Sequence, residues 1–213
     1  MQSEKRDMSL LGQFRCPTGL HGRTVAKLMN RGHSNLSEWG LKKIKIGSHF
    51  VILDVGCGGG KNISRMADLA FQGKVYGIDY SGTMVKYSRE TNKNLINRNR
   101  VEVVRGSVEK ISFSENFFDL VTAIETYYFW PNLPNAFREI NRVLKPTRNL
   151  LIINEMIKDG VYETENAEII AKTHVRLLTL HRLECLLESE GFVNIKTFAN
   201  TKSPWNAVLA QKQ

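Results

Sequence analysis

The stretch VILDVGCGGGKN, residues 51–62, joins an apolar run typical of a buried strand to four glycines within five positions. Ordering glycine backbone costs about 0.5–1 kcal/mol relative to alanine. We therefore expect such a cluster where backbone must come close to a ligand. Beyond Lys61 the apolar residues follow helical spacing, so the stretch predicts a strand, a glycine loop and a helix.

Downstream of this loop, strand and helix signals alternate along the chain. Apolar runs predict the strands, and segments with apolar residues at helical spacing predict the helices between them. Because strands that alternate with helices form βαβ units, the sequence predicts an α/β domain with a mainly parallel sheet. Strands are expected at 50–55, 74–79, 101–106, 118–125, 149–156, 192–199 and 205–212, and helices after Ser81 and at 61–72, 133–146, 163–172 and 179–190.

Composition indicates one domain with a short extension. The chain has 213 residues, of which 42% are hydrophobic, and this is ample for a core. We expect residues 1–48 to be a helical extension, with helices at 24–30 and 36–45, and residues 49–213 to be the main domain.

Cysteine usage and hydropathy favour a reducing compartment. Cys16, Cys57 and Cys185 are odd in number and lack metal-ligand spacing, so we expect no metal site. No apolar run reaches the roughly 18 residues that a membrane helix needs. The N-terminus also lacks the apolar region of a signal peptide. Together these features predict a cytoplasmic location.

The formal net charge of +9 has two interpretations. A nucleic-acid partner is one, because phosphate contacts dominate such binding. A solvated basic surface is the other. The densest basic cluster, at 89–105, contains no aromatic residue on which bases could stack. This favours the solvated surface and leaves a nucleic-acid partner as the less favoured alternative.

The glycine loop does not fit two common phosphate-binding patterns. A P-loop requires a serine or threonine after the lysine, but Asn62 follows Lys61. In a dinucleotide fingerprint starting at Gly56, the third glycine position falls on Lys61. The remaining pattern is D-x-G-x-G-x-G, in which Asp54 precedes the glycines. An acid there is unfavourable for a pyrophosphate and suits a ligand that carries an ammonium group.

At this point the sequence resembles the class I, Rossmann-like S-adenosylmethionine-dependent methyltransferases, and within them the UbiE-like small-molecule group. Four blocks carry the resemblance in the family's order: ILDVGCGGG, GIDYS, GSVEKISFSENFFDLV and EINRVLKP…LLIINE. The resemblance implies a Rossmann-like, seven-stranded, mostly parallel sheet with helices on both faces and an N-terminal helical lid. It also implies S-adenosylmethionine as cofactor, with S-adenosylhomocysteine as product.

Several residues are expected to bind that cofactor. Asp79, which ends the second strand, is placed to accept both ribose hydroxyls. Tyr80 or Met84 is expected to pack on the adenine. After the third strand the family usually has an acid for the adenine amino group, and here Ser107 and the Val108 amide take its place. The full set is Asp54, Gly56, Cys57, Gly58, Gly60, Asp79, Tyr80, Met84, Ser107, Val108 and Glu125, with Cys57 expected to be structural.

The acceptor side is expected in AIETYYFWPNLP, residues 123–134, which lacks the motif typical of amino-methylating nucleic-acid enzymes. If this segment is extended, Tyr127 and Tyr128 point in opposite directions. Aromatic residues with one carboxylate suit a flat or cationic small molecule. For Phe129 and Trp130, packing in the hydrophobic core is an equally weighted alternative. Candidate catalytic residues are His33, Glu125, Tyr127 and His174.

The predicted function is methyl transfer to a small-molecule acceptor by in-line displacement, through orientation and desolvation. Two alternatives stay open: an RNA methyltransferase that uses the basic surface, and a catalytically silent protein that binds the cofactor. The predicted partner is the acceptor itself, with no membrane span and a monomeric or homodimeric state.

Overall fold

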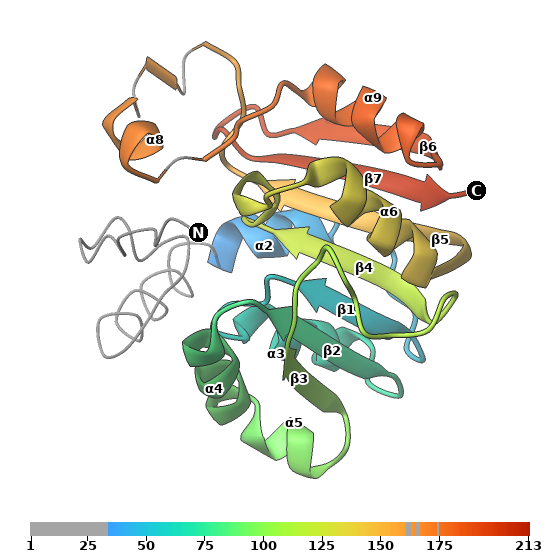
Figure 1. Ribbon diagram of the computed structural model, residues 1–213. Helices are drawn as coiled ribbons and strands as arrows, with labels where there is room; N and C mark the ends of the chain where they lie inside the picture. The colour runs from blue at the N-terminus through green and yellow to red at the C-terminus, as the bar shows by residue number, and fades with distance from the viewer. Residues whose placement is uncertain (1–33, 161–162, 165–166, 174) are drawn as a thin grey trace, which may run out of the picture.

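The computed structural model describes residues 34–160, 163–164, 167–173 and 175–213. They form a seven-stranded sheet in the order β3-β2-β1-β4-β5-β7-β6, with helices on both faces (Figure 1). The first five strands are parallel, and β7 lies antiparallel between β5 and β6. This confirms the expected Rossmann-like fold. The strands are β1 (Val51–Val55), β2 (Lys74–Asp79), β3 (Val101–Arg105), β4 (Phe118–Ile124), β5 (Leu144–Asn154), β6 (Phe192–Ala199) and β7 (Asn206–Lys212).

Alternating side chains of β4 separate two hydrophobic cores. Leu120 and Ile124 face a core shared with α2, α3 and α4, whereas Val121 and Ala123 face one shared with α6 and α9. Every residue of β4 is buried, as expected for a strand covered on both faces. The helices are α2 (Ser34–Leu41), α3 (Lys61–Leu69), α4 (Gly82–Thr91), α5 (Lys93–Asn97), the 3-10 helix η2 (Tyr127–Phe129), α6 (Leu133–Val143), α8 (Ala167–Thr173) and α9 (Leu180–Ser189).

Three helices end earlier than the sequence predicts, and the first is the helix expected at 61–72, which ends at Leu69. The helix expected at 133–146 ends at Val143, because Leu144 is already extended (φ −69°, ψ 141°) and begins β5. Proline disfavours helix at the residue before it, so Pro146 acts upstream of its own position. The helix expected at 36–45 ends at Leu41. The helix expected at 24–30 lies outside the described residues.

The carboxyl ends of the parallel strands lie at one edge of the sheet, which we call the carboxyl edge. Figure 1 shows α8 and the turn between β6 and β7 at this same edge, on the left. Ligands of open α/β sheets bind at such an edge. No helix in the described ranges is long and apolar enough to cross a membrane. Because residues 1–33 are outside those ranges, the division at residue 48 and the lid stay predictions.

Candidate active site

Backbone N–H groups of the glycine loop donate hydrogen bonds to residues at the end of β2. The N–H groups of Gly56 and Cys57 donate to the Ile78 carbonyl oxygen at 2.8 and 3.0 Å. The Gly58 N–H donates to Asp79 Oδ2 at 2.8 Å. Asp79 Oδ1 accepts the Ser81 N–H, also at 2.8 Å. A single carboxylate therefore joins the loop to the start of α4.

The three glycines of the D-x-G-x-G-x-G pattern have left-handed backbone, with φ of 70°, 51° and 77° at Gly56, Gly58 and Gly60. Their surroundings differ. A Cβ on Gly56 would collide with the Thr126 side chain, and one on Gly60 would collide with Ser88. A Cβ on Gly58 would meet no atom within 4 Å. Gly58 therefore borders open space, while the other two also allow close packing.

Two acids lie behind the loop. Asp54 is buried in β1 and its Oδ1 accepts the Thr122 hydroxyl at 2.7 Å. Burial raises the pKa of Asp54 to about 7, the Thr122 hydrogen bond opposes this, and the Asp79 charge adds to it. Burial also raises the pKa of Asp79, against its two backbone hydrogen bonds. Each raised pKa means that negative charge here is destabilised until a cation arrives. A pyrophosphate would be repelled.

Glu125 connects the ends of β4 and β5. Its backbone is left-handed, with φ of 56°, a conformation that costs about 1–3 kcal/mol in a residue other than glycine. Glu125 Oε1 accepts the Glu155 N–H at 2.6 Å, and Oε2 accepts the Tyr128 hydroxyl at 2.8 Å. The side chain is buried. Through these two hydrogen bonds, the Glu125 carboxylate links the first residue after β5 to the aromatic segment.

The aromatic segment is not extended, so the condition under which Tyr127 and Tyr128 would point in opposite directions is not met. Tyr127 and Tyr128 lie in η2, are both buried, and have ring centroids 5.3 Å apart. Burial raises the pKa of Tyr127 to about 12, so its phenol is neutral at physiological pH. Trp130 packs against Phe137 with ring centroids 5.7 Å apart, and it donates to Thr126. Of the two interpretations of Trp130, the core-packing one is confirmed.

The residues expected around the adenine come from the segments after β2 and β3 and from α4. Tyr80 is 67% exposed, and the Arg105 guanidinium lies 5.8 Å from its ring centroid. Met84 is buried. The Ser107 hydroxyl accepts the Glu109 N–H at 3.2 Å. Val108, also buried, belongs to the core on the α6 side of the sheet.

Cys57 is buried, and burial raises the pKa of its thiol well above the usual value. A thiol that stays protonated is a poor nucleophile, which agrees with a structural role. His33 and His174, two of the candidate catalytic residues, lie outside the described residues. The described parts of the chain contain no cluster of metal-ligating side chains.

Two residues that hold the site in place by hydrogen bonds were not predicted from the sequence. Thr122 holds Asp54, as described above. Asn92 is buried and its Nδ2 donates to the Gly60 carbonyl oxygen at 3.0 Å, while its Oδ1 accepts the Ser64 hydroxyl at 2.8 Å. Both residues come from elements that are distant in sequence, and no local motif marks them.

The sheet order, the fastened glycine loop and the acid at the end of β2 together define the class I methyltransferase type of Rossmann-like fold. Comparison with known proteins agrees. Residues 53–152 match a family of methyltransferase domains. An S-adenosylmethionine-dependent methyltransferase from Aquifex aeolicus superposes with a TM-score of 0.70 at 24% identity, covering 89% of this chain and 98% of that one.

Curated relatives point the same way. Sterol 4-C-methyltransferase strm-1 of Caenorhabditis elegans is 29% identical over 79% of this chain and 46% of its own length. Demethylmenaquinone methyltransferase of Lactiplantibacillus plantarum is 31% identical over 57% of this chain and 52% of its own length. The chain thus spans about half the length of these relatives. Residues 53–152 thus match a methyltransferase domain, and the fold of the chain is shared with an S-adenosylmethionine-dependent methyltransferase.

Proposed function

We propose that this protein transfers a methyl group from S-adenosylmethionine to a small-molecule acceptor. The observation that carries the proposal is the joint between the glycine loop and β2, where Asp79 holds the Gly58 N–H. That joint places a carboxylate and an open stretch of backbone side by side. Asp54, buried beneath the loop, supplies negative charge for a cationic ligand.

The residues that the structure describes around the glycine loop fit the nucleoside part of S-adenosylmethionine. Each Asp79 oxygen accepts one backbone N–H and keeps a lone pair for a ribose hydroxyl. The open side of Gly58 leaves room for the ligand. Tyr80, Met84, Ser107 and Val108 are proposed to surround the adenine. When bound, S-adenosylmethionine supplies a methyl group already activated by its positive sulfur, so the protein mainly orients the reactants and excludes water.

On the acceptor side, the proposal assigns the wall to Glu125, Tyr127 and Tyr128. The hydrogen bond at 2.8 Å keeps the Tyr128 proton directed at Glu125 Oε2. This pair fixes the shape of the wall, and burial keeps water from it. Sterol and demethylmenaquinone methyltransferases among the relatives support a small, flat acceptor. His33 and His174 stay candidate bases.

Two further properties belong to the proposal. We propose a cytoplasmic location, supported by the free thiols of Cys57 and Cys185. We also propose a monomer or homodimer, with nucleic acid as the less favoured partner. Size-exclusion chromatography with light scattering measures the molar mass and so distinguishes the monomer from the homodimer.

Calorimetric titration with S-adenosylhomocysteine tests the cofactor site. We expect binding by the wild-type protein and binding about 1,000-fold weaker by Asp79→Ala. Asp68→Ala is the matched control, because Asp68 is an exposed acid on α3 outside the loop. Equal affinity of all three proteins would overturn the site. A screen for S-adenosylhomocysteine release with quinol, sterol, phenol and amine acceptors then tests catalysis.

A further inference from the structure

The face of the molecule formed by α2, the segment after it and β6 combines lysines with half-buried aromatic rings. Lys43 Nζ lies 4.4 Å from the centroid of the Trp39 ring and 5.6 Å from that of Phe198. Trp39 and Trp205 have ring centroids 6.2 Å apart. We define the basic aromatic face as Trp39, Lys43, Lys45, Lys196, Phe198 and Trp205.

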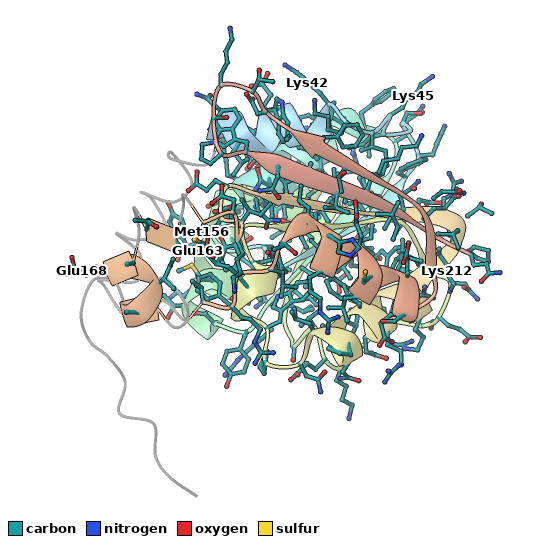
Figure 2. All side chains as sticks on the ribbon, turned by 90° about the horizontal axis from the view of Figure 1, so that it is seen from above. Lys42, Lys45, Met156, Glu163, Glu168 and Lys212 are labelled. Atoms are coloured by element: carbon teal, nitrogen blue, oxygen red, sulfur yellow. The ribbon has the colours of Figure 1, made fainter. Side chains whose placement is uncertain are left out.

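Register in the sheet places Lys196 on this face. Lys196 pairs with Leu209, and Phe198 pairs with Ala207, across β6 and β7. Leu209, Phe198 and Ala207 all belong to the core on the α2 side. Because alternate residues of a strand share one side of the sheet, Lys196 points to the same side. Lys42 and Lys45 project from the same edge of the molecule in Figure 2.

The charge of this face is largely uncompensated. Lys42 is paired with Glu38 at 3.0 Å. Lys43, Lys45 and Lys196 form no ion pair with any residue that the structure describes. The opposite side of β6 differs, because a groove of about 570 Å³ there is lined by Glu184 and Glu188 of α9. At β6, Lys196 therefore lies on the side of the sheet opposite these two acids.

The basic aromatic face borders the candidate active site. Trp205 directly precedes Asn206, which pairs with Asn154 at the carboxyl end of β5. Glu155, whose N–H donates to Glu125, is the next residue. Figure 1 shows α2 and the turn between β6 and β7 at the carboxyl edge. A molecule that lies against this face would be next to the acceptor side of the site.

We propose that the basic aromatic face docks the protein onto bilayers that contain anionic lipid. Tryptophan rings and lysine stems are the side chains that suit a membrane–water interface, where rings rest among headgroups and ammonium groups meet lipid phosphates. A nucleic acid fits less well. Successive bases stack on ring faces, but the Trp39 and Trp205 planes are tilted by 54° to each other and offer no common stacking platform.

Co-sedimentation with vesicles tests the proposal. We expect the wild-type protein to bind phosphatidylcholine vesicles that contain phosphatidylserine and to leave pure phosphatidylcholine vesicles unbound. The double variant K45Q/K196Q should bind about 25-fold more weakly, since each lysine near an anionic surface contributes about fivefold. The matched control is K86Q/K93Q, which removes two exposed lysines from α4 and α5 and leaves the same net charge.

Equal weakening in both double variants would overturn the proposal, since only net charge would then matter. It would also be overturned if a single-stranded RNA, but no vesicle, bound through Lys45 and Lys196. Tryptophan fluorescence gives a second measurement. Emission should shift to the blue on anionic vesicles in the wild-type protein, and the shift should shrink in W205F. Cofactor and acceptor are absent from these measurements, so their outcome is separate from that of the proposed methyl transfer.

Discussion

Two aspartates, one at the amino ends of the parallel strands and one at their carboxyl ends, have different hydrogen-bond and ion-pair partners. Asp119, at the amino end of β4, accepts the Val51 N–H at 2.9 Å and lies 2.9 Å from Lys145 and 3.4 Å from Arg148. Asp79, at the carboxyl end of β2, accepts two backbone N–H groups. It forms no ion pair with any residue in the described ranges.

The difference separates a structural acid from one that is ready for a ligand. The protein itself neutralises Asp119 with two basic side chains. Asp79 and Asp54 have no basic side chain paired with them in the described ranges, and burial raises the pKa of both. Groups with perturbed pKa values that lack an internal counter-ion are typical of functional sites. Substituting one acid at a time should therefore affect ligand binding at Asp79 and stability at Asp119.

The largest effect is expected for ligand binding by Asp79→Ala. It removes two charge-assisted hydrogen bonds to ribose, each of about 1.5–3 kcal/mol, so affinity for S-adenosylhomocysteine should fall about 1,000-fold by calorimetry. Asp119→Ala should leave that affinity within about twofold while lowering the free energy of unfolding, because the Val51 N–H loses its acceptor. Similar losses of affinity in both variants would erase the distinction between the edges.

Asp54→Asn should flatten the dependence of stability on pH. Burial raises the pKa of Asp54 to about 7, above its usual value of 3.8, so the folded state keeps a proton that the unfolded state has released. This contribution to stability is full below the unfolded pKa and is lost as pH rises through about 7. The free energy of unfolding of the ligand-free protein should fall by about 2–3 kcal/mol between about pH 5 and pH 8.

Urea unfolding at several pH values measures this slope. The D54N variant should lose most of it, and Asp119→Asn serves as the control with an acid already paired to Lys145. An unchanged slope in D54N would mean that Asp54 is ionised throughout this range, and the contrast between the two edges would then rest on Asp79 alone.

Within the glycine loop, substitution of Gly60 is expected to affect mainly stability, and substitution of Gly58 mainly ligand binding. Gly60→Ala should lower the free energy of unfolding by about 2 kcal/mol, because its Cβ collides with Ser88 at a φ of 77°. Gly58→Ala meets no atom, so only its left-handed backbone should cost about 1 kcal/mol. Its affinity for S-adenosylhomocysteine should nevertheless fall about tenfold. Thermal unfolding with and without ligand distinguishes the two; a normal ligand-induced shift in G58A would contradict the assignment.

The smallest effect is expected at the acceptor wall. Tyr128→Phe removes the hydroxyl that donates to Glu125 Oε2 and should lower the free energy of unfolding by about 1–2 kcal/mol. S-adenosylhomocysteine affinity should not change. Tyr87→Phe, on the α4 side, is a control of the same chemistry. A loss of cofactor affinity in Y128F would move Glu125 from the acceptor wall to the cofactor site.

Local sequence patterns predicted much of this architecture. The apolar run at 51–55, the glycines after it and the acid at residue 79 lie within one βαβ unit, so periodicity and spacing were sufficient to place them. A helix was also correctly predicted after Ser81, whose hydroxyl accepts the Met84 N–H at the start of α4. Each of these features depends on neighbours that are close in the chain.

Features that depend on tertiary contacts escaped prediction. The Thr122 hydroxyl reaches Asp54 across 68 positions, and Asn92 reaches Gly60 across 32. The compact turn at η2 buries both Tyr127 and Tyr128, which alternate sides only in an extended chain. The left-handed backbone of Glu125 is similarly invisible in sequence, because a glutamate there gives no turn signal.

The order β5-β7-β6 places the final strand of the sequence inside the sheet instead of at its rim. During synthesis, β5 and β6 therefore emerge before the segment that joins them, residues 206–212, and each must wait with an unpaired side. An interrupted chain that stops short of Asn206 would display two such open sides at once. Nascent or cleaved forms of this protein should thus be prone to self-association until the missing strand is supplied.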